Sequence, residues 1–223
     1  MDNKLSVVGK LSEYYSENPI VRSLLQLVPG WGSADTLLQE RANQIRSERL
    51  KALFNELAEG KHELTEELIQ SEDFLHGYFC TLRAVINTRH KEKIRLFARL
   101  LRNSVSGDAG YNPDEYDELV SILYLLSLRE FKALLLLHNL EAQYPRKSDE
   151  NDLQNTLTYW KEFQNEITKS FGIPMKYFAA FMAKIERTGL YLRITGNYYD
   201  YNGDVGRTTD LFTRLLEYVQ ESS

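Results

Sequence analysis

The sequence predicts a mainly α-helical protein in two parts, a helical bundle over residues 1–106 and a helical domain over residues 107–223 that ends with a small β-hairpin. Apolar residues recur at helical spacing along most of the chain. Glycine-rich turn residues next to an alternating segment, a pattern typical of a hairpin, appear near the C-terminus. A polar stretch at 106–114 contains two glycines, an asparagine and a proline, and predicts the boundary between the parts.

The first part contains several predicted helices. An apolar helix ends at the breaker Pro29–Gly32, and a long helix follows and ends near Gly60. After an acidic stretch, apolar residues keep helical spacing from Phe74 to Leu101. We expect a bend in that region near Asn87–His90.

The second part begins with local signals for helix starts. Pro113 suits the first turn of a helix, because its missing N–H would have no intrahelical partner there. Ser127 and Glu130 form a capping-box pattern before a very apolar helix. A further amphipathic segment covers residues 153–163.

The C-terminal region combines a helix–turn–helix with a hairpin. A short helix stops near Gly172, and the next helix starts at Pro174 and ends near Gly189. An alternating strand over 190–195, a turn region over 196–206 and a closing helix follow. This order predicts a winged-helix-like unit, a fold used by DNA readers, dimerisation modules and scaffolds alike.

Composition excludes several classes of protein. Of the 223 residues, 43% are hydrophobic, which is enough for a substantial core, and the net charge of -5 argues against a surface that coats nucleic acid. Cys80 is the only cysteine, so no internal disulfide can form, and its apolar neighbours predict a buried structural thiol. We expect a cytoplasmic protein, because the N-terminus lacks a signal-peptide pattern and no apolar run approaches the ~20 residues that span a bilayer.

Motifs for catalysis and metal binding are missing from the sequence. The four histidines are scattered, without the His-Glu-x-x-His spacing of a zinc site and without a cysteine cluster. The sequence contains neither a nucleophile elbow nor a phosphate-binding loop. We therefore expect no catalytic residues, no metal, no cofactor and no enzymatic activity.

Two surfaces are candidates for contact with a partner. One is a basic helix, whose cations could meet an acidic protein or phosphates: Arg89, Lys91, Lys93, Arg95, Arg99 and Arg102. The interpretation that we favour is that this helix complements the acidic stretch Glu56–Asp73 within the bundle, or is simply solvated. The other candidate is Trp31, which could enter an interface or a membrane surface, although we favour a role in sealing the end of the bundle.

A winged helix that reads DNA would place its second helix in the major groove. The candidate DNA contacts are then Lys176, Tyr177, Lys184, Arg187, Arg193 and Arg207. Residues 167–223 carry seven Lys or Arg and six Asp or Glu, whereas dedicated DNA readers usually carry an excess of basic residues. A DNA reader would act as a dimer, so that two modules meet two half-sites.

The second half of the chain resembles bacterial proteins of the Abi-alpha type, which are linked to abortive phage infection. Three segments carry the resemblance: Leu126–Glu130, Ile185–Leu190 and Gly206–Thr213. It implies a role in stress or phage defence and assigns no catalytic residues. The sequence thus predicts a non-enzymatic protein-interaction or scaffold protein, which could form a homodimer. A DNA-binding regulator is the alternative, and a membrane-acting effector is the second alternative.

Overall fold

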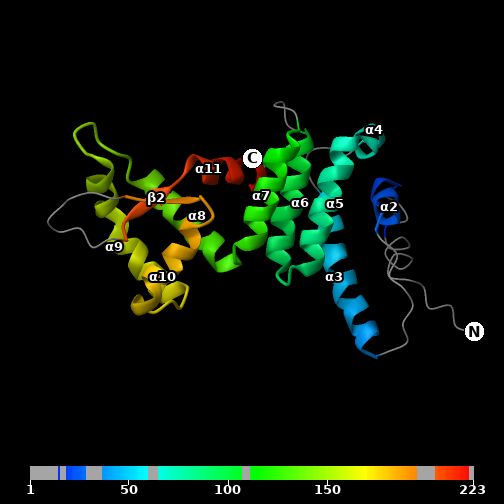
Figure 1. The fold of residues 1–223 in the computed structure, drawn as a ribbon, viewed down its shortest axis with the longest axis horizontal. Helices are drawn as coiled ribbons and strands as arrows, with labels where there is room; N and C mark the ends of the chain where they lie inside the picture. Colours follow the sequence, from blue (N-terminus) through cyan, green and yellow to red (C-terminus); the bar gives the residue numbers. More distant parts are fainter. Residues whose placement is uncertain are drawn as a thin grey trace, which may run out of the picture. The chain divides into compact units, whose positions relative to one another are not determined.

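A computed structural model of the protein describes residues 15, 19–28, 37–59, 65–106, 111–194 and 204–220. As the sequence predicts, these residues are mainly helical and include a small two-stranded antiparallel hairpin near the C-terminus (Figure 1). The chain divides into two compact units. Unit 1 comprises Met1–Tyr124 and Tyr218–Ser223, and unit 2 comprises Leu125–Glu217.

This division differs from the boundary expected at 106/107. The helix that starts at the predicted Pro113, α7 (Pro113–Leu125), lies almost wholly in unit 1. Its Tyr116 is buried and shares a hydrogen bond with the hydroxyl of Thr81. The last residues of the chain also belong to unit 1, where Asn103 donates a hydrogen bond of 2.7 Å to the carbonyl of Tyr218. Long-range contacts, and not the polar loop, therefore set the boundary.

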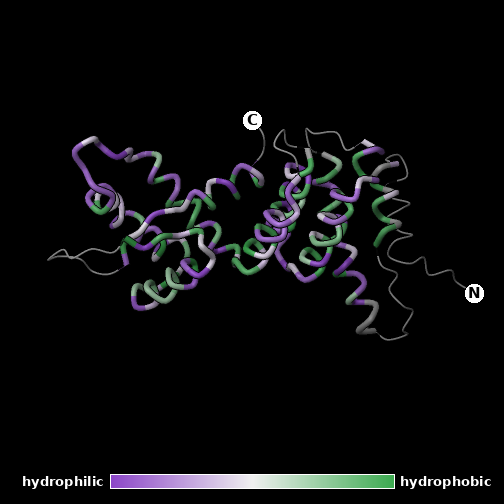
Figure 2. The backbone as a smooth tube through the Cα atoms, turned by 45° about the horizontal axis from the view of Figure 1, so that its top comes forward, coloured by the Kyte–Doolittle hydropathy of each residue, from purple (hydrophilic) through white to green (hydrophobic). Residues whose placement is uncertain are grey.

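Unit 1 is built from amphipathic helices around an apolar core. Besides α7 they are α2 (Pro19–Gln26), α3 (Leu37–Glu59), α4 (Glu66–Gln70), α5 (Glu72–Asn87) and α6 (Lys91–Ser106). The long α3 agrees with the predicted helix that ends near Gly60, and α5 and α6 lie side by side (Figure 1). Figure 2 shows hydrophobic and hydrophilic residues interspersed along these helices. The fully buried side chains include Leu53, Phe54, Phe74, Phe97 and Leu119.

The predicted bend between α5 and α6 is a complete break. Thr88 is extended, with φ -93° and ψ 125°, and its backbone N–H donates to the carbonyl of Val85. The buried hydroxyl of Thr88 donates to the carbonyl of Ala84 at 2.8 Å. The threonine thereby satisfies two of the carbonyl groups that a helix C-terminus leaves without partners.

Unit 2 begins with α8 (Leu128–Gln143), where the predicted capping box of Ser127 and Glu130 is confirmed. The next helix, α9 (Asp152–Ser170), is continuous, so the separate segment at 153–163 and the short helix before Gly172 are one element. Polar residues 164–166 include no breaker and do not interrupt it. Gly172 adopts φ 63° in the turn to α10 (Met175–Glu186).

The hairpin consists of β1 (Tyr191–Arg193) and β2 (Gly206–Thr208), with Tyr191 opposite Thr208 and Arg193 opposite Gly206. Glycine is required at position 206, because a Cβ atom there would overlap the Tyr191 hydroxyl and the carbonyl of Leu192. The closing helix is α11 (Asp210–Val219). The tip of the predicted wing, 195–203, lies outside the described residues, and the winged-helix interpretation stays a prediction.

An aromatic cluster joins the helix–turn–helix to the hairpin. The buried Trp160 of α9 lies 5.1 Å from the ring of Phe163, 5.9 Å from that of Phe178 and 6.5 Å from that of Tyr191. These rings come from α9, α10 and β1. Because Phe178 is buried in this cluster, the packing of the rings determines which side of α10 faces the core of unit 2 and which side faces outward.

Candidate functional site

Half of the predicted basic contact surface, three of its six cations, is engaged by Glu56 of α3. The Arg99 Nε atom lies 2.6 Å from Glu56 Oε1, and Arg102 donates a hydrogen bond of 2.8 Å to the Glu56 carbonyl. Arg95 lies 3.7 Å from the same carboxylate but is 61% exposed. Glu56 of α3 thus interacts with three cations of α6. This supports the interpretation that the charged helices complement each other.

The remaining cations of that surface divide into buried and exposed. Lys93 is buried and donates a hydrogen bond of 2.9 Å to the carbonyl of Tyr124. Lys93 and the equally buried Arg102 therefore do not lie on a contact surface, which corrects the prediction for these two residues. Arg89 and Lys91 are exposed at the start of α6. Trp31, the other predicted contact, lies outside the described residues.

Three of the predicted DNA contacts occupy the exposed side of α10 or its C-terminal end. Lys176 and Tyr177 are exposed in the first turn, with the lysine Nζ 5.0 Å from the tyrosine ring centre. Arg187 is exposed at the last turn. Lys176 and Arg187 have no ion-pair partner among the described residues.

Lys184 of the predicted set pairs with the capping box of α8. Its Nζ lies 3.0 Å from Glu130 Oε1, while the other Glu130 oxygen accepts the backbone N–H of Ser127 at 2.7 Å. Burial of Glu130 opposes ionisation, but the hydrogen bonds from Ser127 and the ammonium of Lys184 outweigh it and lower the pKa of Glu130. The ion pair thus ties α10 to the start of α8.

The two arginines of the hairpin are also paired with acids. Arg193 lies 2.9 Å from Glu186 and 4.0 Å from Asp204, and its side chain is 30% exposed. Arg207 lies 3.6 Å from Asp152. These interactions hold the hairpin against α9 and α10, so the two cations are partly neutralised within unit 2.

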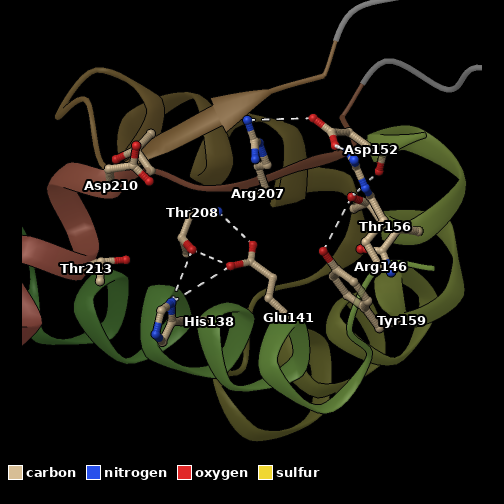
Figure 3. Close-up of a pocket in the computed structure, with 12 residues that line it drawn as sticks. His138, Glu141, Arg146, Asp152, Thr156, Tyr159, Arg207, Thr208, Asp210 and Thr213 are labelled. Atoms are coloured by element: carbon tan, nitrogen blue, oxygen red, sulfur yellow. Dashed lines mark hydrogen bonds and ion pairs between the residues drawn. The ribbon is translucent and has the colours of Figure 1, made fainter. Parts of the chain in front are cut away.

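The described residues of unit 2 form a polar pocket with a volume of about 370 Å³ (Figure 3). The C-terminal half of α8, the loop after it, the first turns of α9 and α11, and strand β2 all contribute. The lining residues are His138, Glu141, Arg146, Asp152, Asn155, Thr156, Tyr159, Arg207, Thr208, Thr209, Asp210 and Thr213.

One wall of the pocket is a hydrogen-bonded cluster around Glu141. Its carboxylate accepts the backbone N–H of Thr208 at 2.7 Å and also the hydroxyl of that residue. His138 Nδ1 lies 3.3 Å from the Thr208 hydroxyl and 3.9 Å from the Glu141 carboxylate (Figure 3). Burial raises the pKa of Glu141, although the bonds from Thr208 oppose this.

This cluster has the geometry of an anchor for β2. In a nucleophilic relay, the two nitrogens of the imidazole contact the hydroxyl and the acid separately. Here the hydroxyl of Thr208 and the carboxylate of Glu141 both face the same nitrogen of His138. The arrangement positions the strand on α8.

The opposite wall carries balanced charge. Asp152 Oδ1 lies 2.7 Å from Arg146, and Asp152 Oδ2 lies 3.6 Å from Arg207 (Figure 3). Behind them, burial raises the pKa of Tyr159 to about 12. A small anion that entered the pocket would have to displace the carboxylate of Asp152 from both arginines.

Sequence reasoning missed the pocket because its residues come from four separate elements. The one local signal was His138 and Glu141, three residues apart on a helix after a run of four leucines. It also missed a group of potential metal ligands, His76, Cys80 and Asp117, which meet in unit 1.

Among the described residues, no helix has the length and apolar character needed to cross a lipid bilayer.

Comparisons of the chain with protein-family models, with curated proteins and with solved structures give no match. Any functional inference therefore has to come from the chemistry of the described surfaces.

Proposed function

We propose that unit 2 is a protein-interaction module. The exposed face of α10 binds a segment of another protein that has apolar residues in its centre and acidic residues at its ends. The α10 face consists of Met175, Lys176, Tyr177, Ala179, Ala180 and Arg187. The observation that carries the proposal is the composition of this face. Lys184 of α10 and the hairpin cations Arg193 and Arg207 are paired with acids, whereas the exposed residues of the α10 face include apolar side chains.

The exposed apolar groups of this face suit protein recognition. Met175 is 53% exposed and Tyr177 is 55% exposed, and the alanines of the following turn are exposed as well. Tyrosine and methionine are favoured in protein interfaces, since both supply large contact areas, and methionine adapts its shape to the partner. Small alanine side chains let a partner backbone approach the helix closely.

Charge indicates the chemistry of the partner. Lys176 and Arg187 stand at the two ends of the face and have no acidic partner among the described residues of unit 2. Complementary charge guides association and fixes the register of an interface. A segment with apolar residues in its centre and Asp or Glu at its ends would complement this face.

DNA binding is the alternative function. The order of α8, α9, α10 and the hairpin supports it, because α10 follows a short turn and leaves Lys176 and Arg187 exposed. Against it stand the ion pairs of Lys184, Arg193 and Arg207. A place in bacterial stress or phage defence stays a prediction from the sequence resemblance.

A peptide-display experiment tests the proposal. The purified full chain is used to select from a library of random displayed peptides, and selected peptides are then titrated by fluorescence anisotropy. We expect enrichment of apolar sequences flanked by acids, with binding at least ~10-fold weaker for Tyr177→Ala, which corresponds to about 1.4 kcal/mol. Leu157→Ala is the matched control, because Leu157 is 53% exposed on α9.

Charge reversal provides the second arm. Lys176→Glu should weaken peptide binding, whereas Lys161→Glu, which reverses an exposed charge on α9, should leave it unchanged. The same variants are titrated with labelled duplex DNA at low and moderate salt. Salt-sensitive DNA binding that is lost in Lys176→Glu, together with peptides indifferent to Tyr177, would replace the proposal with the DNA-binding alternative.

A further inference from the structure

A cluster of three ligand-type side chains lies in unit 1, far along the chain from the α10 face. His76 and Cys80 stand one turn apart on α5, so that both side chains project from the same side of the helix. Asp117 comes from α7. The His76 Nε2 atom lies 3.1 Å from Asp117 Oδ1 and 3.9 Å from Cys80 Sγ, and all three ligand atoms lie within 4.8 Å of one another.

We propose that His76, Cys80 and Asp117 bind a divalent transition-metal ion with the preferences of Zn²⁺. Tetrahedral zinc with bonds of about 2.0–2.3 Å separates its nitrogen and oxygen ligands by about 3.4 Å, and its nitrogen and sulfur ligands by about 3.6 Å. The distances of 3.1 and 3.9 Å found here bracket these values.

The donor set selects the class of metal. A thiolate and an imidazole favour zinc and similar ions, whereas magnesium and calcium prefer sites made of oxygen alone. His76 and Asp117 are exposed and Cys80 is half-buried, so an ion can enter from solvent. Three protein ligands leave a fourth position for water, as in zinc sites that are not purely structural.

Tyr111 provides a second observation beside the cluster. Its ring packs edge-to-face against the imidazole of His76, with the centroids 6.3 Å apart. Its hydroxyl is buried and has no hydrogen-bond partner among the described residues. A buried hydroxyl without a partner costs stability, and a metal-bound water beside His76 would supply the missing partner.

Cobalt spectroscopy tests the site on the full chain. Metal-free protein, kept reduced, is titrated with Co²⁺, and the near-ultraviolet charge-transfer band of a cobalt thiolate is recorded. We expect one equivalent to produce the band, and Zn²⁺ to displace it. Cys80→Ser should abolish the band, while His76→Gln and Asp117→Asn should each weaken Co²⁺ binding at least ~10-fold, as expected for loss of a metal ligand.

Two controls separate this site from adventitious binding. His90→Gln removes an exposed histidine outside the cluster and should change nothing. Circular dichroism of each variant establishes that its helices are intact. A band that persists unchanged in both Asp117→Asn and His76→Gln would show a lone thiolate ligand and overturn the proposal. The same conclusion would follow from folded wild-type protein that gives no band.

Discussion

Replacing Lys184 tests the assignment of this residue to the capping box instead of to a DNA contact. The Glu130 side chain is 6% exposed and the Lys184 side chain is 61% exposed, with 3.0 Å between their charged atoms. Exposed ion pairs contribute less than about 1 kcal/mol, whereas removing one partner of a buried pair costs about 3–5 kcal/mol. For this half-exposed pair we expect Lys184→Gln to lower the free energy of unfolding by about 1–2 kcal/mol.

The loss should depend on pH in a defined direction. Because the pKa of Glu130 is lowered in the folded protein, ionised Glu130 contributes stability above the ordinary glutamate range. That contribution is lost as the pH falls through the folded pKa. The difference between wild type and Lys184→Gln should therefore be complete at pH 7 and shrink in acid.

The assay is urea unfolding followed by the fluorescence of Trp160, which is buried in unit 2 and reports on that unit. The second tryptophan of the chain is removed by Trp31→Phe in every variant. Glu130→Gln and the double variant with Lys184→Gln complete a double-mutant cycle. A coupling energy below about 0.3 kcal/mol, or a loss that is the same in acid as at pH 7, would refute the assignment.

Four other changes have outcomes that follow from the described contacts. Gly206→Ala should lower stability by about 2–3 kcal/mol in thermal unfolding, since its Cβ would overlap the Tyr191 hydroxyl. Gly172→Ala, at φ 63° with open space around it, should lower stability by only about 1 kcal/mol. Equal losses of stability in Gly206→Ala and Gly172→Ala would contradict this reasoning. Glu56→Gln weakens the pairing of two α6 arginines and should cost about 2 kcal/mol in chemical unfolding followed by circular dichroism; an unchanged midpoint would contradict it. Because the pKa of Glu141 is raised on folding, wild-type stability should rise relative to Glu141→Gln as pH falls below neutral, and a constant difference in urea unfolding would argue against it.

Local signals in the sequence predicted the helices well. The capping box at Ser127, the helix start at Pro113 and the interruption before α6, which was predicted as a bend, each depend on residues within one or two turns. The continuous α9 was missed because residues 164–166 are polar, which weakens an apolar pattern without breaking a helix. Element ends are thus readable where a cap or a proline marks them.

Long-range contacts were beyond prediction from a single sequence. Nothing in the local pattern assigns α7 to unit 1, because the buried bond between Tyr116 and Thr81 joins residues 35 positions apart. The same holds for Cys80, expected as an inert buried thiol, which lies beside Asp117 of α7. Burial, together with hydrogen bonding to that aspartate and its charge, raises the pKa of Cys80 to about 11.

The division of the chain has a consequence for its synthesis. Because Tyr218 belongs to unit 1 and its carbonyl accepts a hydrogen bond from Asn103, a ribosome translates all of unit 2 before this contact of unit 1 can form. Unit 2 is continuous in sequence and needs no later segment to finish its core. Of the two units, unit 1 thus contains both the segment translated before unit 2 and the segment translated after it.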